Sequence, residues 1–217
     1  MELVAYLILV KRLSELGRKF YIAGWIIHPT AMNSKRIAII ATLVSLAIAT
    51  NYAMMPFYNI KLMDIIVFLG GFCFGPLAGA LIGVTSWAVY GTLNPLGFSI
   101  PVLLATMFSE AIYGVAGGLI KKSFTENFSG FKKEQTSVYV FFGILGFLLT
   151  LTYDVITNIV FGYMYSPSIL VAIIVGFVPF GLAHVISNAF FFGLGCVPAI
   201  NALLNVIEVE NFDSPKK

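Results

Sequence analysis

Charge is scarce in this sequence. Only 11% of its 217 residues are Asp, Glu, Lys or Arg, whereas a soluble globular domain carries roughly 25%. Apolar residues make up 59% of the chain and the mean hydropathy is +0.94. These values exclude a soluble protein, and no polar stretch is long enough for a second domain. The sequence therefore predicts one all-α integral membrane domain.

Cysteine and the common catalytic motifs are also scarce. Cys73 and Cys196 lie in apolar segments without CxxC or metal-ligand spacing, so both are interpreted as small core residues. HExxH, GxSxG and the phosphate-binding GxxxxGK[ST] do not occur in the sequence. The basic residues lie in pairs near helix ends, without the interleaved aromatics of a nucleic-acid surface. We expect no catalysis, metal, cofactor or nucleic-acid partner, and any ATP hydrolysis must come from other subunits.

Apolar runs of roughly 20 residues predict membrane-spanning helices. Four are clear, at residues 37–55, 100–120, 137–162 and 169–197. Residues 62–93 are too long for one crossing and short for two full ones. The stretch "GGFCFGP" within them has glycines at 70, 71 and 75 followed by Pro76, which favours a tight turn between two short helices.

Basic residues test this count, because cytoplasmic loops collect Lys and Arg. Six spans with both termini cytoplasmic leave only Lys61 outside, whereas five spans put seven basic residues outside and six inside. The six-helix membrane domain is predicted at residues 32–205, followed by a cytoplasmic tail at 206–217. Residues 1–31 are either an amphipathic surface segment or precede the natural start at Met32.

Ionisable side chains at membrane depth are costly and usually mark functional sites. The predicted spans contain four: Asp64, Glu110, Asp154 and His184. Each has polar neighbours at helical spacing, so we expect the polar faces to converge. The three faces are Thr150, Asp154 and Asn158; Thr106, Glu110 and Tyr113; His184 and Asn188.

The outer ends of the predicted helices carry a candidate substrate pocket. Aromatic rings there could stack on a ligand, while Asn and carboxylate side chains orient it. Structural roles are the alternatives. Trp87 and Tyr90 could be ordinary interfacial aromatics, and Asn158 and Asn188 could bond neighbouring helices. Lys61 and Asp64 could form a local (i, i+3) pair. The pocket residues proposed on this basis are Tyr58, Asn59, Lys61, Asp64, Trp87, Tyr90, Asn94, Asp154 and Asn158.

Small residues recur every four positions in the first span, at Ala41, Ser45, Ala49 and Ala53. In a membrane, such ridges let another helix approach closely. The approaching helix could belong to a partner or to the same bundle.

Together these features resemble the substrate-binding S components of energy-coupling factor (ECF) vitamin transporters. The resemblance rests on the "MNSKR" leader, the ridge in the first span, the polar "NIKLMD" opening of the second, the "GPLAGALIG" turn and the basic loop after the fourth. It covers roughly residues 32–205.

The resemblance implies a vitamin or related micronutrient bound near the outer face. It also implies a membrane coupling subunit, two ATPase subunits and a prokaryotic plasma membrane. The coupling subunit would dock on Ala41, Ser45 and Ala49. The implied substrate-binding residues are Asn59, Asp64, Trp87, Tyr90, Asn94, Asp154 and Asn158, to which the polar faces add Glu110 and His184.

Two other functions compete with this hypothesis. An intramembrane enzyme could use Glu110, Asp154 and His184 as acid, base or metal ligands. "TYD" at 152–154 matches half of an aspartyl protease signature, but the partner GxGD is absent from the sequence. An ion-coupled carrier would be supported by inverted repeats, and the two halves show no convincing similarity.

Overall fold

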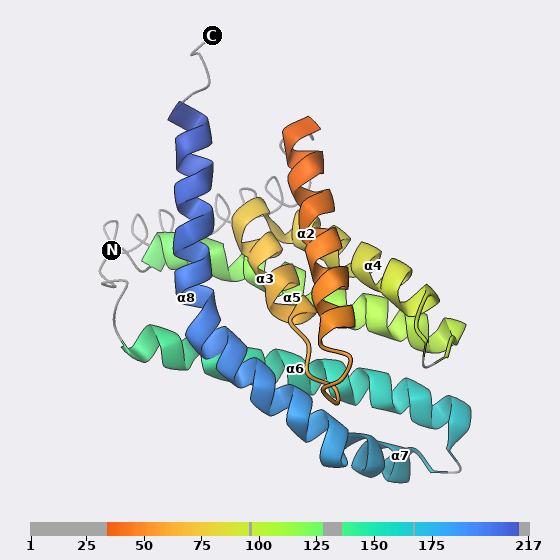
Figure 1. Cartoon of the computed structure of the whole chain (residues 1–217). Helices are drawn as coiled ribbons and strands as arrows, with labels where there is room; N and C mark the ends of the chain where they lie inside the picture. Colours follow the sequence, from red (N-terminus) through yellow and green to blue (C-terminus); the bar gives the residue numbers. More distant parts are fainter. Residues whose placement is uncertain (1–33, 96, 128–135, 167, 213–217) are drawn as a thin grey trace, which may run out of the picture. The chain divides into compact units, whose positions relative to one another are not determined.

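The computed structural model describes residues 34–95, 97–127, 136–166 and 168–212. Two units divide the chain at Ile37, and the second contains every helix beyond the first turn of α2. All regular elements of the described residues are helical (Figure 1). They are α2 (Ser34–Ala53), α3 (Met63–Phe74), α4 (Pro76–Thr92), α5 (Ile100–Asn127), α6 (Thr136–Tyr165), α7 (Ile169–Gly176), the π-helical turn η1 (Phe177–Gly181) and α8 (Leu182–Phe212).

Three described segments are long and apolar enough to cross a membrane: Ile100–Lys121, Thr136–Tyr165 and Ile169–Leu203. Ile37–Ala53 and Met63–Phe74 are shorter apolar helices. The described part of the chain is thus all-helical, and its apolar helices indicate a multi-pass membrane protein. The count of six spans and the orientation of the termini stay predictions. The segment predicted before residue 32 lies outside the described residues.

The predicted division of residues 62–93 into two helices is confirmed, but the turn is shorter than expected. Only Gly75 leaves the helical conformation, with φ 97° and ψ 163°, a region that side chains disfavour. Pro76 then occupies the first turn of α4, where its missing N–H costs nothing. Gly70 and Gly71 lie inside α3, so their assignment to the turn was wrong.

Gly71 instead allows the helices to pack closely. A Cβ on Gly71 would lie 1.8 Å from the carbonyl oxygen of Gly114, and one on Gly114 would lie 2.1 Å from the carbonyl carbon of Gly79. The backbones of α3, α4 and α5 therefore meet without intervening side chains. This close approach is the usual way for helices to associate where lipid gives no hydrophobic drive.

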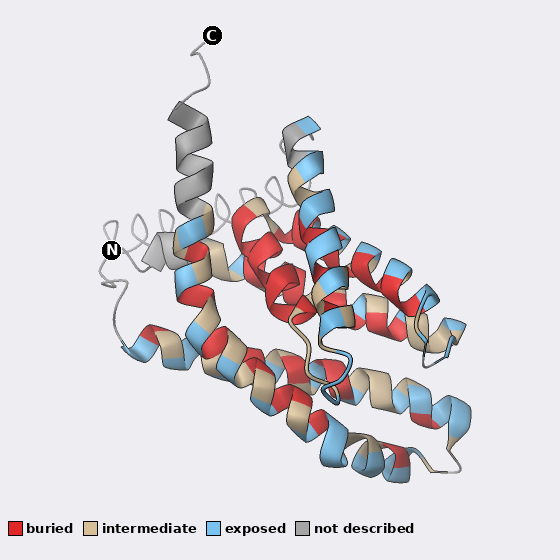
Figure 2. Ribbon diagram, viewed as in Figure 1, coloured by how far each residue is buried: buried red, intermediate tan, exposed pale blue. Residues whose placement is uncertain are grey.

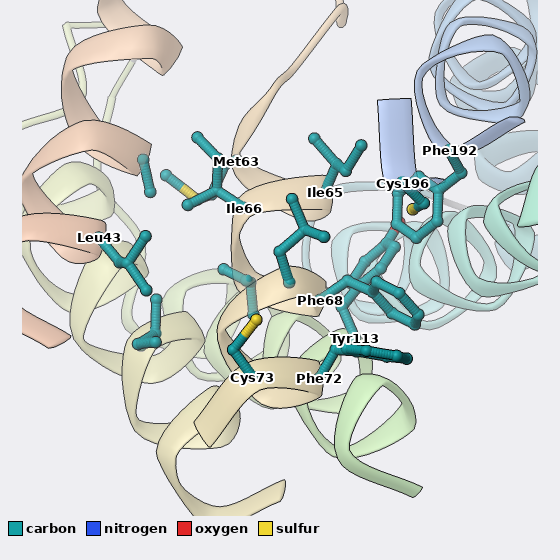
Figure 3. Close-up of a cluster of buried hydrophobic side chains, with 14 of the residues drawn as sticks. Leu43, Met63, Ile65, Ile66, Phe68, Phe72, Cys73, Tyr113, Phe192 and Cys196 are labelled. Carbon is teal, nitrogen blue, oxygen red and sulfur yellow. The ribbon is translucent and has the colours of Figure 1, made fainter. Parts of the chain in front are cut away.

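Helix α3 forms the centre of the core. Residues 63–73 are all buried, as the nearly continuous red of α3 in Figure 2 shows. Such a helix must be surrounded, and α3 packs against α4, α5 and α8. In Figure 3 the Phe68 ring lies beside those of Tyr113 and Phe192. The Phe68 and Phe192 centroids are 5.1 Å apart.

The last predicted span, 169–197, is not one continuous helix. Helix α7 ends at Gly176, η1 follows, and Val178 is non-helical at φ −115° and ψ 114°. Pro179 explains the break, because proline lacks an N–H and disfavours helical geometry in the residue before it. The interruption lies immediately before His184, and α8 then runs against α6.

Candidate functional site

Three ionisable side chains from three helices form a bridge at the centre of the bundle. His184 on α8 places Nε2 2.7 Å from Asp64 Oδ2 and Nδ1 2.9 Å from Asp154 Oδ1. Asp64 and His184 are completely buried, and Asp154 is 4% exposed. Asp64 lies in the first turn of α3, where free backbone N–H groups favour an acid. We call Asp64, His184 and Asp154 the Asp–His–Asp bridge.

The two contacts of His184 fix the number of protons in this bridge. Each nitrogen-to-oxygen contact needs one proton, whereas a neutral imidazole carries a single N–H. With both contacts made as hydrogen bonds, the bridge would hold one proton beyond that of a neutral imidazole between two carboxylates, and its net charge would be −1 rather than −2.

A second layer of hydrogen bonds lies one helical turn away. Asn188 on α8 donates to Asp64 Oδ2 and, over 2.9 Å, to Thr150 Oγ1 on α6. Tyr113 on α5 donates its hydroxyl to the same Thr150 oxygen at 2.9 Å. Four helices are thereby joined through buried polar groups, and the predicted convergence of their polar faces is present in the structure.

Aromatic side chains enclose the other side of the site. Trp87 on α4 donates Nε1–H to Glu110 Oε2 at 3.0 Å. The ammonium of Lys61 lies 5.3 Å from the Trp87 ring centroid and 5.0 Å from that of Tyr153. Both distances are within cation–π range. We call Trp87 and Tyr153 the aromatic pair, and the seven residues Asp64, Glu110, Tyr113, Thr150, Asp154, His184 and Asn188 the polar cluster.

The polar cluster has more acceptors than donors. Among the described residues, four of its buried oxygens have no hydrogen-bond partner: Asp64 Oδ1, Glu110 Oε1, Asp154 Oδ2 and Asn188 Oδ1. Leaving a buried acceptor unpaired costs about 1–3 kcal/mol. A proton shared between Asp64 and Glu110 would satisfy Asp64 Oδ1 and Glu110 Oε1. Asp154 Oδ2 and Asn188 Oδ1 would still have no hydrogen-bond partner. The cluster is thus chemically suited to an occupant that supplies donors or positive charge.

A hollow of about 320 Å³ lies beside the interrupted segment, lined by Tyr58, Pro179, Phe180 and Ala183. Its lining residues flank Gly181, where an added Cβ would lie 3.3 Å from Asp154 Oδ2. Asn59 donates to the Phe180 carbonyl oxygen at 3.1 Å. The connection between α2 and α3 therefore contacts the same segment that borders the bridge.

The structure separates the predicted pocket residues into a central set, a set near the hollow, and two residues that belong to neither. Asp64, Asp154 and His184 meet directly, Glu110 meets Trp87, and Tyr90 packs edge-on against Trp87 with centroids 5.4 Å apart. Tyr58 lines the hollow, and Asn59 bonds the carbonyl oxygen of Phe180, another of its lining residues. Asn94 lies in the turn after α4. The side chain of Asn158 packs against Gly176 so closely that a Cβ on this glycine would lie 2.1 Å from Asn158 Oδ1.

One predicted local contact is absent from the described residues. The Lys61 ammonium forms no ion pair with Asp64 and lies over the aromatic pair instead. Residues 60–62 are not helical, so an (i, i+3) spacing does not bring these two side chains together.

Tyr153 and three further buried polar residues were not predicted from the sequence. Tyr153 precedes Asp154, and its apolar ring hid its place beside Lys61. Asn51, Ser86 and Ser109 are buried with unpaired side-chain atoms. Small hydroxyl and amide side chains are common in membrane helices, so they gave no distinct signal.

The ridge of small residues in α2 faces away from the core. Ala41, Ser45 and Ala49 are exposed, whereas Leu43, Val44 and others between them are buried. Ser45 donates its hydroxyl to the Ala41 carbonyl oxygen at 2.8 Å, which leaves a smooth surface. Burial against the helices that the structure describes therefore does not account for the ridge.

The comparisons with known proteins agree with this architecture. Residues 35–194 match the family described as ECF transporter, substrate-specific component. No curated protein and no solved structure gave a significant match. The matched range covers more than half of the 217 residues and includes the whole Asp–His–Asp bridge. The chain belongs to the family of substrate-specific components of ECF transporters.

Proposed function

We propose that this protein binds a vitamin or related micronutrient at the outer face of a prokaryotic plasma membrane. It delivers the cargo inward together with a membrane coupling subunit and two ATPase subunits. The single observation that carries the cargo site is the set of unpaired acceptor oxygens in the polar cluster, of which Asp154 Oδ2 and Asn188 Oδ1 stay unpaired even when Asp64 and Glu110 share a proton. A bound solute that supplies donors offsets the cost of burying them.

The approach to this site runs through the α2–α3 connection. Residues 55–58 are exposed, and the residues that line the hollow flank Gly181, whose backbone lies close to the Asp154 carboxylate. Lys61 is the one basic residue that the six-span topology places outside. Cargo therefore enters from the side of the connection and meets Asp154 and the aromatic pair.

The exposed ridge of α2 is the proposed docking face for the coupling subunit. Small side chains permit backbone approach, and Ala41, Ser45 and Ala49 present no bulk. The chain has no ATP-binding motif of its own, so the energy must arrive through such a contact.

The test is purification of the tagged full chain from its own host's membranes, followed by mass spectrometry. Two ATPases, a membrane subunit and a small molecule released on denaturation are the expected companions. Ser45→Leu should remove the protein partners while retaining the small molecule, and Leu46→Ala, also on the exposed side of α2, is the matched control. A protein that arrives alone and empty would favour the intramembrane enzyme or ion-coupled carrier built on Glu110, Asp154 and His184.

A further inference from the structure

Lys61 reaches into the site from a segment that is not part of a helix. It lies in the α2–α3 connection, and the recorded side-chain contacts of that connection with η1 are the Asn59 bond to the Phe180 carbonyl and the Tyr58–Phe180 ring contact. Both partners belong to the interrupted segment beside the hollow. The lysine is therefore carried on a segment outside the regular helices, and this segment contacts η1.

The ammonium of Lys61 is poorly matched to its surroundings. It carries three N–H donors, yet among the described residues its recorded close contacts are the two rings of the aromatic pair. At the same time Asp154 Oδ2 and Asn188 Oδ1 stay unpaired even when Asp64 and Glu110 share a proton. A cation without the lysine's attachment to the backbone could lie on the rings and approach Glu110, whose Oε2 bonds Trp87.

The charge of the site decides which ligand can take the place of the Lys61 ammonium. The site holds three carboxyl groups, of Asp64, Glu110 and Asp154, against two basic groups, Lys61 and His184. Lys61 interacts electrostatically with Asp64, Glu110 and His184. Departure of its ammonium leaves the cluster more negative, which penalises an anion and favours a cation.

We propose that Lys61 is an internal placeholder, and that the cargo carries a positively charged nitrogen that takes the position of its ammonium between Trp87 and Tyr153. This inference rests on the proposed transport function and names the chemical class of its cargo. The lysine stabilises the empty site and competes with the cargo. An anionic cargo would instead need Lys61 to stay in place and pair with it, so the two possibilities predict opposite effects of removing the lysine.

The test uses the full chain with Trp25→Phe, which leaves Trp87 as the only tryptophan. Its fluorescence is titrated with n-butylammonium, n-butanol and butyrate, which share a four-carbon chain and differ in charge. If Lys61 leaves the rings in about one molecule in ten, removing it raises the apparent affinity for a cation about tenfold. Lys61→Met should therefore bind n-butylammonium about tenfold more tightly than the lysine protein, with no saturable response to the other two probes.

Lys121→Met is the matched control, because Lys121 bonds the Cys73 carbonyl oxygen at the opposite end of α3. It should bind like the lysine protein. If Lys61→Met unfolds, Lys61→Gln provides the same comparison with a polar side chain. Equal affinity with and without Lys61, a preference for butyrate, or no response in the folded variants would overturn the inference. Failure of the transport function itself appears separately, as absence of subunits and small molecule in the host purification.

Discussion

Replacing His184 with phenylalanine should be one of the most damaging changes in the bundle. Phenylalanine is of comparable size but makes neither the 2.7 Å contact with Asp64 nor the 2.9 Å contact with Asp154. Both carboxyl groups would stay buried without their partner. Removing one member of a buried ionic group costs about 3–5 kcal/mol, so His184→Phe should lower the free energy of unfolding by about that amount.

The coupling free energy between His184 and Asp154 indicates whether the bridge is charged. Neutral hydrogen bonds between membrane helices couple by about 0.6 kcal/mol on average, with a maximum near 1.7. Bonds to charged groups contribute about 1.5–3 kcal/mol. Because the bridge needs an extra proton between the ring and the carboxylates, the His184–Asp154 coupling should be about 2 kcal/mol.

A double-mutant cycle measures this coupling. His184→Phe, Asp154→Leu and the double variant are unfolded with SDS in mixed micelles and followed by circular dichroism. The control cycle combines His184→Phe with Thr152→Val instead of Asp154→Leu. Thr152 is an exposed residue of α6, and its hydroxyl bonds the Leu148 carbonyl oxygen. That cycle should be additive within about 0.5 kcal/mol. A His184–Asp154 coupling below about 0.6 kcal/mol would refute a charge-assisted bridge.

Two further predictions concern packing and the aromatic side of the site. Gly114→Ala should destabilise the protein by about 3 kcal/mol, because its Cβ would meet the Gly79 carbonyl carbon at 2.1 Å, a backbone atom that cannot move aside. Gly195→Ala is the control and should cost under about 1 kcal/mol, since its Cβ meets the flexible end of the Ile65 side chain at 3.0 Å. If unfolding in micelles shows the same loss of stability for both variants, the close packing at Gly114 is contradicted. Trp87→Phe should cost about 1–3 kcal/mol by leaving Glu110 without its donor, and Tyr90→Phe much less.

The sequence predicted those parts of the fold that depend on local chemistry. A glycine followed by proline ends one helix and begins the next, and this occurs at Gly75 and Pro76. Residues four apart lie on one face of a helix, so Thr150 with Asp154, and His184 with Asn188, were expected to act together, and they do.

The remaining features depend on contacts between distant segments. The position of Lys61 over the aromatic pair follows from where α4 and α6 place Trp87 and Tyr153, 26 and 92 residues further along the chain. Spacing within one helix holds no such information. The break at η1 did have a local signal in Pro179, but the apolar run around it resembles an uninterrupted span.

The most direct measurement of the central claim is the cargo content of Asp154→Asn relative to the unaltered protein. Both are purified from host membranes, and the released small molecule is quantified against protein while unfolding is measured in parallel. Asparagine can still accept a bond from His184, so stability should fall by only about 1 kcal/mol. Loss of the charge at the cargo site should reduce the bound small molecule about tenfold or more. Full occupancy in Asp154→Asn, or loss of cargo matched by an equal loss of folding stability, would contradict a binding role for this carboxylate.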